Sequence, residues 1–263
     1  MRLRQIALVA AELSMVEEAL CDVLGLEVCY RDPAVGRWGL VNALMPLGGS
    51  FLEVVAPVAP DTSAGRYLAR RGGDGGYMVI LQCADAPAWR RRLEAMGVRA
   101  VATADRAEYR YTHFHPADTG GILLSIDSVA ADADWRAEDC PWPPAGPGWT
   151  GDRGWGAGAL LAAELQSPDP AAMAALWSRL LDRPAVPRPE GGSEIRLENA
   201  ALRFVAAKDG RGRGLGAIDL ALPDPARAVR AARARGLPAQ DGLVEVGGLR
   251  LILHQAPART GGA

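Results

Sequence analysis

The stretch Leu8-Val-Ala-Ala-Glu-Leu13 returns in the second half of the chain as Leu160-Leu-Ala-Ala-Glu-Leu165. Two further pairs of segments match in the same order along the chain. They are Phe51-Leu-Glu-Val-Val-Ala56 with Ala201-Leu-Arg-Phe-Val-Ala206, and Gly120-Gly-Ile-Leu-Leu-Ser-Ile126 with Gly247-Gly-Leu-Arg-Leu-Ile-Leu253. The last pair has a shorter offset than the others, so the second half has lost residues. A duplicated domain explains all of these matches.

A cycle of one strand, one helix and three short strands repeats within each half. In the first cycle, Arg4–Ala10 is an apolar strand, and Ser14–Leu24 is a predicted helix because its apolar residues recur at helical spacing. Ser14 can cap this helix, and Gly25 ends it. Short strands are expected around Glu27–Tyr30 and then on both sides of Gly48-Gly49, which predicts a hairpin turn.

Three further cycles follow, each with an apolar strand and a helix that begins at a proline. The predicted strands are Tyr77–Cys83, Ala159–Leu165 and Ala217–Leu222, and the predicted helices are Pro87–Met96, Pro170–Leu181 and Pro225–Arg235. Further short strands complete each cycle. The predicted fold class is α+β, built from tandem βαβββ units.

A Pro/Gly-rich segment, Asp139-Cys-Pro-Trp-Pro-Pro-Ala-Gly-Pro-Gly-Trp149, separates the two halves and reads as a linker. Its glycines Gly146, Gly148 and Gly151 match a GxGxxG pattern, but no strand precedes them, so a dinucleotide site is rejected. The predicted division of the chain is a first domain over 1–129, a linker over 130–154, a second domain over 155–256 and a tail over 257–263.

Composition excludes several classes of protein. The 263 residues are 49% hydrophobic and 23% charged, which is typical of a folded globular chain. A net charge of −2 gives no reason to expect a nucleic-acid partner. Neither a membrane helix of about 20 apolar residues nor a signal peptide is recognisable, so no membrane partner and a cytoplasmic location are expected. The cysteines form no CxxC pair and are expected to be reduced and mostly buried.

Several segments resemble the vicinal oxygen chelate superfamily, which includes glyoxalase I, methylmalonyl-CoA epimerase, extradiol dioxygenases and bleomycin-resistance proteins. They are the helix exit Val23-Leu-Gly-Leu-Glu-Val28, the hairpin Asn42–Pro57, and His115-Pro-Ala-Asp-Thr-Gly-Gly-Ile-Leu-Leu124. The resemblance is clearest over 1–129 and continues over 155–256. It implies two glyoxalase-like domains, each of two paired units that enclose a cleft, in which a divalent metal usually lies.

The positions that hold the metal in the family are poorly filled in this chain. By the resemblance, the matching residues in the first half are Gln5, Glu53, Met78 (or Tyr77) and Ser125. Their equivalents in the second half are about Ala157, Arg203, Ala217 and Ile252. A hard divalent ion needs several converging oxygen or nitrogen donors, so no metal and no other cofactor are expected at these positions.

Another metal site is the alternative. His113 and His115 alternate on a predicted strand, and Glu53 could complete a two-His-one-carboxylate set for a divalent metal such as iron or zinc. Against this, one histidine could bond within the pocket wall while the other caps the strand end before Pro116. His254, which closes the last strand, is expected to be structural.

A metal-free cleft leaves Glu53 and His115 as the candidate catalytic residues. A partly desolvated Glu53 has a raised pKa and can act as a general base, with His115 as the paired acid. The opposing interpretation is that Glu53 only hydrogen-bonds Gln5 on the facing strand. An electrophile for the developing enolate is not apparent in Asn42 or Tyr77.

The competing class is a small-molecule binding module with an aromatic and apolar cleft. The candidate ligand-binding residues are Gln5, Trp38, Asn42, Tyr77, Met78, Tyr111, His113 and Ser125, and the strand residue Tyr109 shares a face with Tyr111 and His113. The second half could instead be purely structural, closing or dimerising against the first. The sequence therefore predicts binding or turnover of a small organic molecule, with a metal-dependent lyase, isomerase or dioxygenase as the alternative, and leaves a homodimer open.

Overall fold

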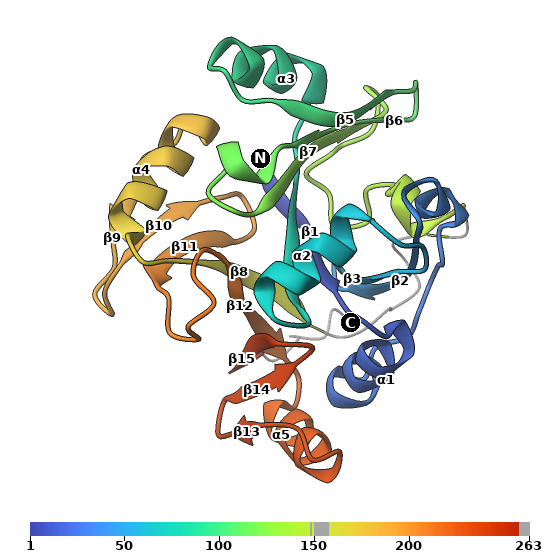
Figure 1. Cartoon of the computed structure of the whole chain (residues 1–263), viewed down its shortest axis with the longest axis vertical. Helices are drawn as coiled ribbons and strands as arrows, with labels where there is room; N and C mark the ends of the chain where they lie inside the picture. Colours follow the sequence, from blue (N-terminus) through green and yellow to red (C-terminus); the bar gives the residue numbers. More distant parts are fainter. Residues whose placement is uncertain (148, 150–157, 258–263) are drawn as a thin grey trace, which may run out of the picture.

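Two mixed β-sheets form the two halves of the protein, as shown by a computed structural model that describes residues 1–147, 149 and 158–257 (Figure 1). Sheet A has the strand order β2-β3-β1-β4-β7-β6-β5, and sheet B has the order β13-β14-β15-β12-β8-β11-β10-β9. In both sheets the opening strands of two units pair antiparallel at the centre, β1 with β4 and β8 with β12. The predicted fold of paired βαβββ units is confirmed.

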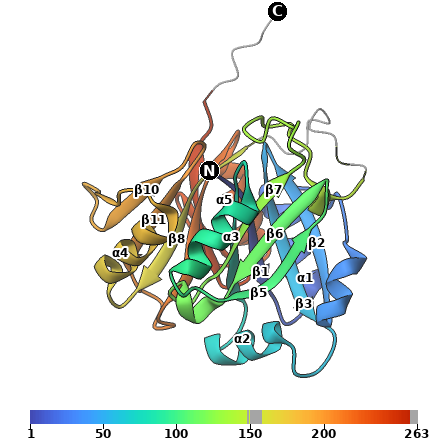
Figure 2. The same cartoon turned by 90° about the horizontal axis from the view of Figure 1, so that it is seen from above.

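The elements of the first half follow the predicted order with one addition. They are β1 (Arg2–Val9), α1 (Leu13–Leu24), the 3-10 helix η1 (Pro33–Trp38), β2 (Leu40–Leu47), β3 (Ser50–Pro57), α2 (Ser63–Arg71), β4 (Gly75–Gln82), α3 (Ala86–Ala95), β5 (Ala100–Asp105), β6 (Tyr109–Phe114), η2 (Pro116–Asp118) and β7 (Leu123–Val129). Helix α2 was not predicted. It connects the two units and lies across one end of the strands of sheet A (Figure 2).

The second half repeats the pattern with shorter outer strands. Its elements, after the short 3-10 turn η3 (Pro143–Ala145), are β8 (Ala159–Ser167), α4 (Pro170–Leu181), β9 (Val186–Pro187), β10 (Ser193–Arg196), β11 (Ala201–Ala206), β12 (Gly214–Leu222), α5 (Pro225–Ala234), β13 (Ala239–Gln240), β14 (Leu243–Val246) and β15 (Leu249–Gln255). The expected proline starts hold, because Asp169 and Asp224 cap α4 and α5 directly before a proline.

Three local predictions in the first unit had different outcomes. The Gly48-Gly49 hairpin is confirmed, because Leu47 pairs with Ser50 across it. The cap at Ser14 is wrong: α1 begins at Leu13 after Glu12, and no side chain caps it. The strand around Glu27–Tyr30 is reduced to one bridge between Tyr30 and Leu44.

The register of the sheets corrects one of the sequence matches. Ala7 pairs with Glu53 across β1 and β3, and Glu164 pairs with Arg203 across β8 and β11. Glu164 is therefore the counterpart of Ala7, and Ala162 is the counterpart of Gln5, in place of the expected Ala157. The resemblance of Leu8–Leu13 to Leu160–Leu165 is five residues out of register, since the first segment leaves its strand and the second lies within β8.

One hydrophobic core joins the two halves. The helix-covered faces of both sheets contribute to a single cluster that includes Leu8 of β1, Leu220 of β12 and Trp177 of α4. Helices α1 and α5 touch at one end of the molecule, and α3 and α4 meet at the other, where Arg92 donates to the carbonyl of Leu180 at 2.9 Å (Figure 1).

The other face of sheet A packs against the segment expected to be a linker. Trp142 and Cys140 are buried there in a second cluster, and Trp142 stacks on Phe51 with ring centroids 6.2 Å apart. Arg4, whose side chain is fully buried, donates to the carbonyl of Cys140 at 2.6 Å. Over its described residues the segment is therefore a wall of the first half; Gly148 and Gly151 of the GxGxxG pattern lie outside the described residues.

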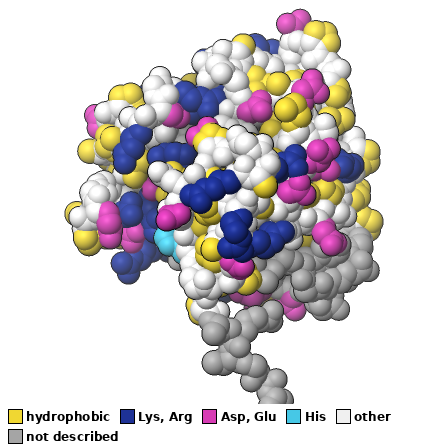
Figure 3. Space-filling view, turned by 90° about the horizontal axis from the view of Figure 1, so that it is seen from below, with side chains coloured by type: hydrophobic (Ala, Val, Ile, Leu, Met, Phe, Trp, Pro, Cys, Tyr) yellow, Lys and Arg dark blue, Asp and Glu magenta, His cyan; other side chains and the backbone are white. Residues whose placement is uncertain are grey.

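Charges of both signs are mixed on the surface. The face in Figure 3 shows Lys and Arg side chains interspersed with Asp and Glu, which agrees with the small net charge of −2. All four cysteines are free, as expected, with two buried and two half-buried. Within the described part of the chain, no helix has the length and apolar character needed to cross a bilayer.

Candidate functional site

A cavity of about 1130 Å³ opens on the face of sheet A that carries no core helix. Its walls come from the strands of sheet A, η1, α2 and the loop before β12. Nine of the ten residues predicted for the site line it: Gln5, Trp38, Asn42, Glu53, Tyr77, Met78, Tyr111, His113 and His115. The tenth, Ser125, lies behind the wall and bonds to His113.

Glu53 is the most constrained polar group in this cavity. Its side chain is buried, and its two oxygens accept hydrogen bonds from the side-chain amides of Gln5 at 2.8 Å and Asn42 at 2.7 Å. The amide oxygens are occupied as well: that of Gln5 accepts from Trp142 Nε1, and that of Asn42 accepts from the Asp32 backbone N–H. Both amides are thereby oriented with their NH2 groups toward Glu53.

Burial decides the protonation of Glu53. Loss of solvent raises its pKa to about 7, although the amides of Asn42 and Gln5 act in the opposite direction by bonding the charged form. Near neutral pH the carboxyl group therefore exists in both states. The expected bond between Gln5 and Glu53 is confirmed, and it coexists with a pKa suited to proton transfer.

His113 is held from behind by a chain of hydrogen bonds. Its Nδ1 lies 2.8 Å from Ser125 Oγ, and Ser125 in turn donates to Asp127, which also accepts from Tyr109. Burial lowers the pKa of His113 to about 4 and raises that of Asp127 to about 7. The imidazole is therefore neutral near pH 7, and when Asp127 is ionised the proton lies on Nδ1, which leaves Nε2 as an acceptor.

Two aromatic rings enclose His113. Tyr111 stacks on it with centroids 4.6 Å apart, and Trp38 lies 5.9 Å away at a tilt. Arg37 covers Trp38 at 4.0 Å and donates a hydrogen bond to the Tyr111 hydroxyl. Since that hydroxyl already accepts from a cation, its own proton is available to an oxygen of a ligand. Tyr109, Tyr111 and His113 thus share the cavity side of β6, as their alternation predicts.

His115 is placed differently from His113. Strand β6 ends at Phe114, and His115 uses Nδ1 to accept the backbone N–H of Ala117 at 3.1 Å, which caps η2. The same nitrogen lies 3.3 Å from Arg99. The histidine before Pro116 therefore caps the 3-10 helix that follows the strand, where the sequence predicted a cap of the strand end. No hydrogen bond between His115 and Glu53 is among those of the described residues.

The residues present do not fit the metal that the fold family implies. Both oxygens of Glu53 accept amide hydrogen bonds, Gln5 turns its nitrogen toward Glu53, and Met78 and Ser125 stand at the other two positions. Across the described residues, no three His, Cys, Asp or Glu side chains come close enough to hold an ion, including the alternative set of Glu53, His113 and His115. In sheet B the corresponding residues are Ala162, Arg203, Ala217 and Ile252.

Sheet B carries charged pairs at the matching positions. Asp219 is buried and binds Arg203 and, at 2.8 Å, Nε2 of His254. This agrees with the structural role expected for His254. The sheet is richer in polar groups than the sequence suggested, because Glu164 also faces Arg250 at 3.6 Å.

Several contributors to the site were not identified from the sequence: Arg37, Asp127, Trp142, the arginines of α2, and Arg211 and Arg213 of the second half. Asp127 carried a signal, since it lies two residues after Ser125 on the same strand face. Trp142 carried none, because its bond to Gln5 joins residues 137 positions apart through a segment without periodicity.

Two solved structures with TM-scores above 0.5 support the fold of paired βαβββ units. In a search of solved structures, the chain is similar to a mutant of 4-hydroxymandelate synthase from Streptomyces coelicolor, with 20% identity, 89% of this chain and 75% of that chain covered, and a TM-score of 0.63. A hypothetical protein from Staphylococcus aureus gives 11% identity, 97% and 99% coverage, and a TM-score of 0.65. Methylmalonyl-CoA epimerase from Mycobacterium tuberculosis gives 26% identity, 49% and 87% coverage, and a TM-score of 0.43.

A search of curated proteins gave no match. The family model described as glyoxalase-like domain matches residues 6–181, from β1 to the end of α4. This match covers well over half of the chain and spans the whole of sheet A with its cavity. The chain therefore belongs to the glyoxalase-like domain family, within the vicinal oxygen chelate fold.

Proposed function

We propose that the cavity of sheet A binds a small organic molecule and moves a proton at a carbon next to a carbonyl, without a metal, as an isomerase or lyase does. Glu53 is the general base. The observation that carries the proposal is that this carboxyl group lines the cavity, is buried, and has a pKa of about 7. A base whose pKa lies near the working pH transfers protons most effectively.

The hydrogen bonds of Glu53 suit a base better than a purely structural carboxylate. Gln5 and Asn42 each donate once, to different oxygens, and the remaining lone pairs are free to accept a proton. The two amides hold the carboxyl plane, so that little reorganisation is needed when the proton arrives.

Tyr111 and Arg37 supply the electrophile that the sequence did not reveal. A carbonyl oxygen becomes more negative as the carbon beside it loses a proton, and it needs a donor in place of a metal. The Tyr111 hydroxyl accepts a hydrogen bond from Arg37, so its own proton is available to an oxygen of the ligand. Both residues line the cavity.

The neutral His113 can accept or return a proton on the same wall. Its neutrality near pH 7 follows from burial, and Ser125 fixes one of its nitrogens. In this proposal His113 takes the role that the sequence gave to His115, whose Nδ1 is committed to the cap of η2. Apolar side chains of Val55, Met78 and Ile80 complete the wall and exclude water.

The test is proton exchange in D₂O, followed by ¹H NMR on small 2-oxo acids and methyl ketones with alkyl or aryl bodies. Wild-type protein is expected to remove the signal of the proton next to the carbonyl. Glu53→Gln is expected to slow this exchange by about 10²-fold or more, which is the usual contribution of a general base. Asp61→Asn, a change at an exposed carboxylate that also lines the cavity, is the matched control.

Three outcomes decide the proposal. Exchange that depends on Glu53 and is unaffected by a chelator supports it. Ligand-induced shifts of protein signals without any exchange contradict catalysis and leave a sequestering protein, the other class that the sequence favoured. Exchange that appears only after addition of iron, zinc or manganese contradicts metal independence.

A further inference from the structure

The second half of the chain contributes to the cavity of the first. Arg211 and Arg213, in the loop between β11 and β12, line the cavity. All the other lining residues come from the first half, apart from Pro144 of the Pro/Gly-rich segment. The duplicated second domain thus supplies part of the cavity wall of the first.

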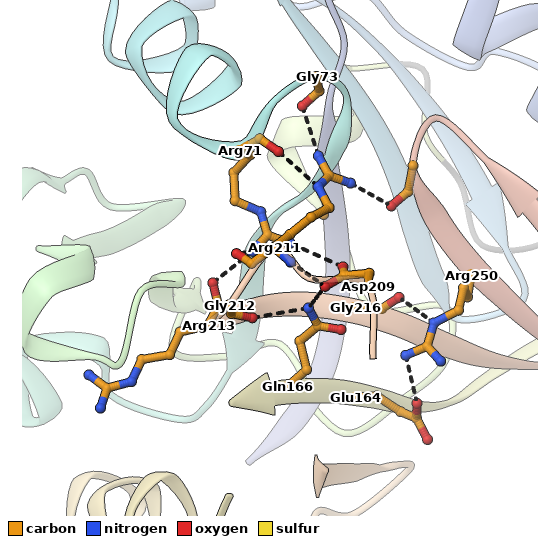
Figure 4. A network of polar contacts seen from close by, with 12 residues as sticks. Arg71, Gly73, Glu164, Gln166, Asp209, Arg211, Gly212, Arg213, Gly216 and Arg250 are labelled. Carbon is orange, nitrogen blue, oxygen red and sulfur yellow. Dashed lines mark hydrogen bonds and ion pairs between the residues drawn. The ribbon is translucent and has the colours of Figure 1, made fainter. Parts of the chain in front are cut away.

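Reciprocal arginine bonds fix this loop to α2 (Figure 4). The guanidinium group of Arg71, at the end of α2, donates to the carbonyls of Arg211 at 2.7 Å and Arg213 at 2.8 Å. The guanidinium group of Arg211 donates back to the carbonyl of Arg71 at 2.9 Å and to that of Gly73 at 3.0 Å. Each arginine therefore binds the backbone of the other's segment.

Sheet B holds the same loop from the other side. Gln166 of β8 donates to Asp209 at 2.6 Å and to the carbonyl of Gly212 at 3.0 Å, and Asp209 lies 3.7 Å from Arg71. The pKa of Asp209 is lowered: its hydrogen bonds to Arg211 and Gln166 and the nearby arginines outweigh its partial burial. The loop is thus clamped between the two halves, and its carboxylate is already neutralised by Arg71.

The side chain of Arg213 takes no part in this network. Its side chain is exposed, and Figure 4 shows it pointing away from Arg71 and Asp209. Arg213 packs closely against Gly121: a Cβ atom placed on Gly121 would lie 3.3 Å from the Cβ atom of Arg213. Gly121 also lines the cavity. Within the described residues, the side chain of Arg213 has neither a hydrogen bond nor an ion pair, although its backbone carbonyl accepts from Arg71.

Arg70 of α2 is a second cation of this kind. Its only described contact is with the ring of Tyr67, at 5.4 Å from the centroid. The described lining of the cavity contains six arginines against three carboxylates, so the cavity has an excess of positive charge. The carboxylates are Asp32, Glu53 and Asp61, and Glu53 is neutral in part at pH 7 because of its raised pKa.

We infer that the ligand of this cavity is an organic anion, whose carboxylate, sulfonate or phosphate group is bound at the mouth by Arg213 of the second half and Arg70 of α2. This inference rests on the proposed function for the location of the reacting end, next to Glu53. An anion bound by Arg213 and Arg70 places its apolar body toward the aromatic wall of β6. Charge-assisted bonds from guanidinium groups favour such anionic groups over neutral ones.

The experiment compares two fluorescent probes that differ in charge: 1-anilinonaphthalene-8-sulfonate and the neutral N-phenyl-1-naphthylamine. The cavity is large enough for either. Wild-type protein is expected to bind the sulfonate about tenfold more tightly, the ratio that one charge-assisted bond of roughly 1.4 kcal/mol gives. Arg213→Gln is expected to remove most of this preference and leave the affinity for the neutral probe unchanged, and Arg70→Gln is expected to reduce it.

Arg230→Gln is the matched control, because Arg230 is an exposed arginine of α5 that does not line the cavity. It changes the net charge by the same amount and is expected to preserve the preference. Equal affinity of wild-type protein for the two probes, failure of both probes to bind, or a preference that survives the double variant Arg70→Gln/Arg213→Gln would overturn the inference.

The outcome is distinguishable from that of the proposed function. Loss of probe preference in Arg213→Gln, together with an absence of proton exchange in any compound, retains the anion site and rejects catalysis. Proton exchange of neutral ketones at the same rate as 2-oxo acids, with no probe preference, retains catalysis and rejects the anion site.

Discussion

The carboxylate of Glu53 and the side-chain amide of Gln5 face each other from neighbouring parallel strands, with Oε2 and Nε2 2.8 Å apart. The resemblance to the vicinal oxygen chelate superfamily places two metal ligands at these positions. In this structure the amide of Gln5 donates to the carboxylate and stabilises its charged form by a hydrogen bond. The result is a buried carboxyl group that can be protonated near neutral pH.

Removal of an amide donor should raise the pKa of Glu53 further. In Asn42→Ala the charged form loses one hydrogen bond while the site stays buried, so the pKa is expected to rise from about 7 by about one unit or more. Infrared difference spectra of the carboxyl C=O stretch, recorded against pH, measure it, with Glu53→Gln identifying the band. A pKa that falls in Asn42→Ala would show that the amide does not stabilise the charged form.

Glu53 should make the protein less stable as the pH rises. Its pKa is raised from 4.5 to about 7 on folding, so the folded state holds a proton that the unfolded state has lost. The stabilisation is complete below pH 4.5 and is lost as the pH passes 7. Relative to wild type, Glu53→Gln should therefore gain stability between pH 5 and pH 8, by on the order of 2 kcal/mol.

Urea denaturation of the two proteins at both pH values measures this difference. Asp127 acts in the same direction as Glu53, and His113, with its lowered pKa, acts in the opposite one. For that reason the comparison uses the difference between variant and wild type at each pH. A difference that is constant between pH 5 and pH 8 would contradict the raised pKa of Glu53.

Trp142 should stabilise the first half although it lies in a Pro/Gly-rich segment. Its side chain is buried against Phe51, so Trp142→Ala is expected to cost about 3–5 kcal/mol of unfolding free energy, as for other large core truncations. Trp142→Phe keeps most of the volume and loses only the bond to Gln5, with an expected cost of about 1–2 kcal/mol. Urea denaturation measures both, and a cost below 1 kcal/mol for alanine would mean that the segment is not packed.

His113 should titrate far below an ordinary histidine. Burial lowers its pKa to about 4, and Trp38 covers part of the ring. Trp38→Ala admits water to the imidazole and is expected to raise the pKa toward 6.5. The measurement is an NMR pH titration of the imidazole protons, with His113→Gln used to assign the signal. A pKa near 6.5 in the wild-type protein would contradict the burial of this ring.

The sequence predicts a helix or strand correctly where capping residues and hydrophobic periodicity indicate the same element. The helix over Pro170–Leu181 matches α4, because an Asp-Pro start and an apolar face act together. Helix α2 was missed because its nine residues are flanked by turn-forming residues and carry only a short apolar stripe. The match of Leu8–Leu13 to Leu160–Leu165 is out of register because short Ala/Leu-rich segments match by composition alone.

The cavity residues were predictable to the extent that strand alternation fixes a face. Tyr111 and His113 were found in this way, whereas Glu53 was identified from the resemblance to the vicinal oxygen chelate superfamily. Arg37 and Arg213 reach the cavity from a 3-10 helix and from a loop of the other half, and Trp142 bonds Gln5 from a Pro/Gly-rich segment. No sequence period governs such segments. The partner of His113 could be found only from the pairing of β6 with β7, which brings Ser125 opposite to it.

Arg71 of α2 and Arg211 of the second half each donate hydrogen bonds to the backbone of the other's segment. These bonds bear on how the two halves of a duplicated chain can diverge. The second half supplies a loop to the cavity wall of the first half. This loop is under selection even if the residues of the second half at the metal-site positions change. Arg203, at the place of Glu53, binds Asp219 and links two strands of sheet B. The walls of the one cavity therefore include residues of both copies, so a change in either copy can alter the same site.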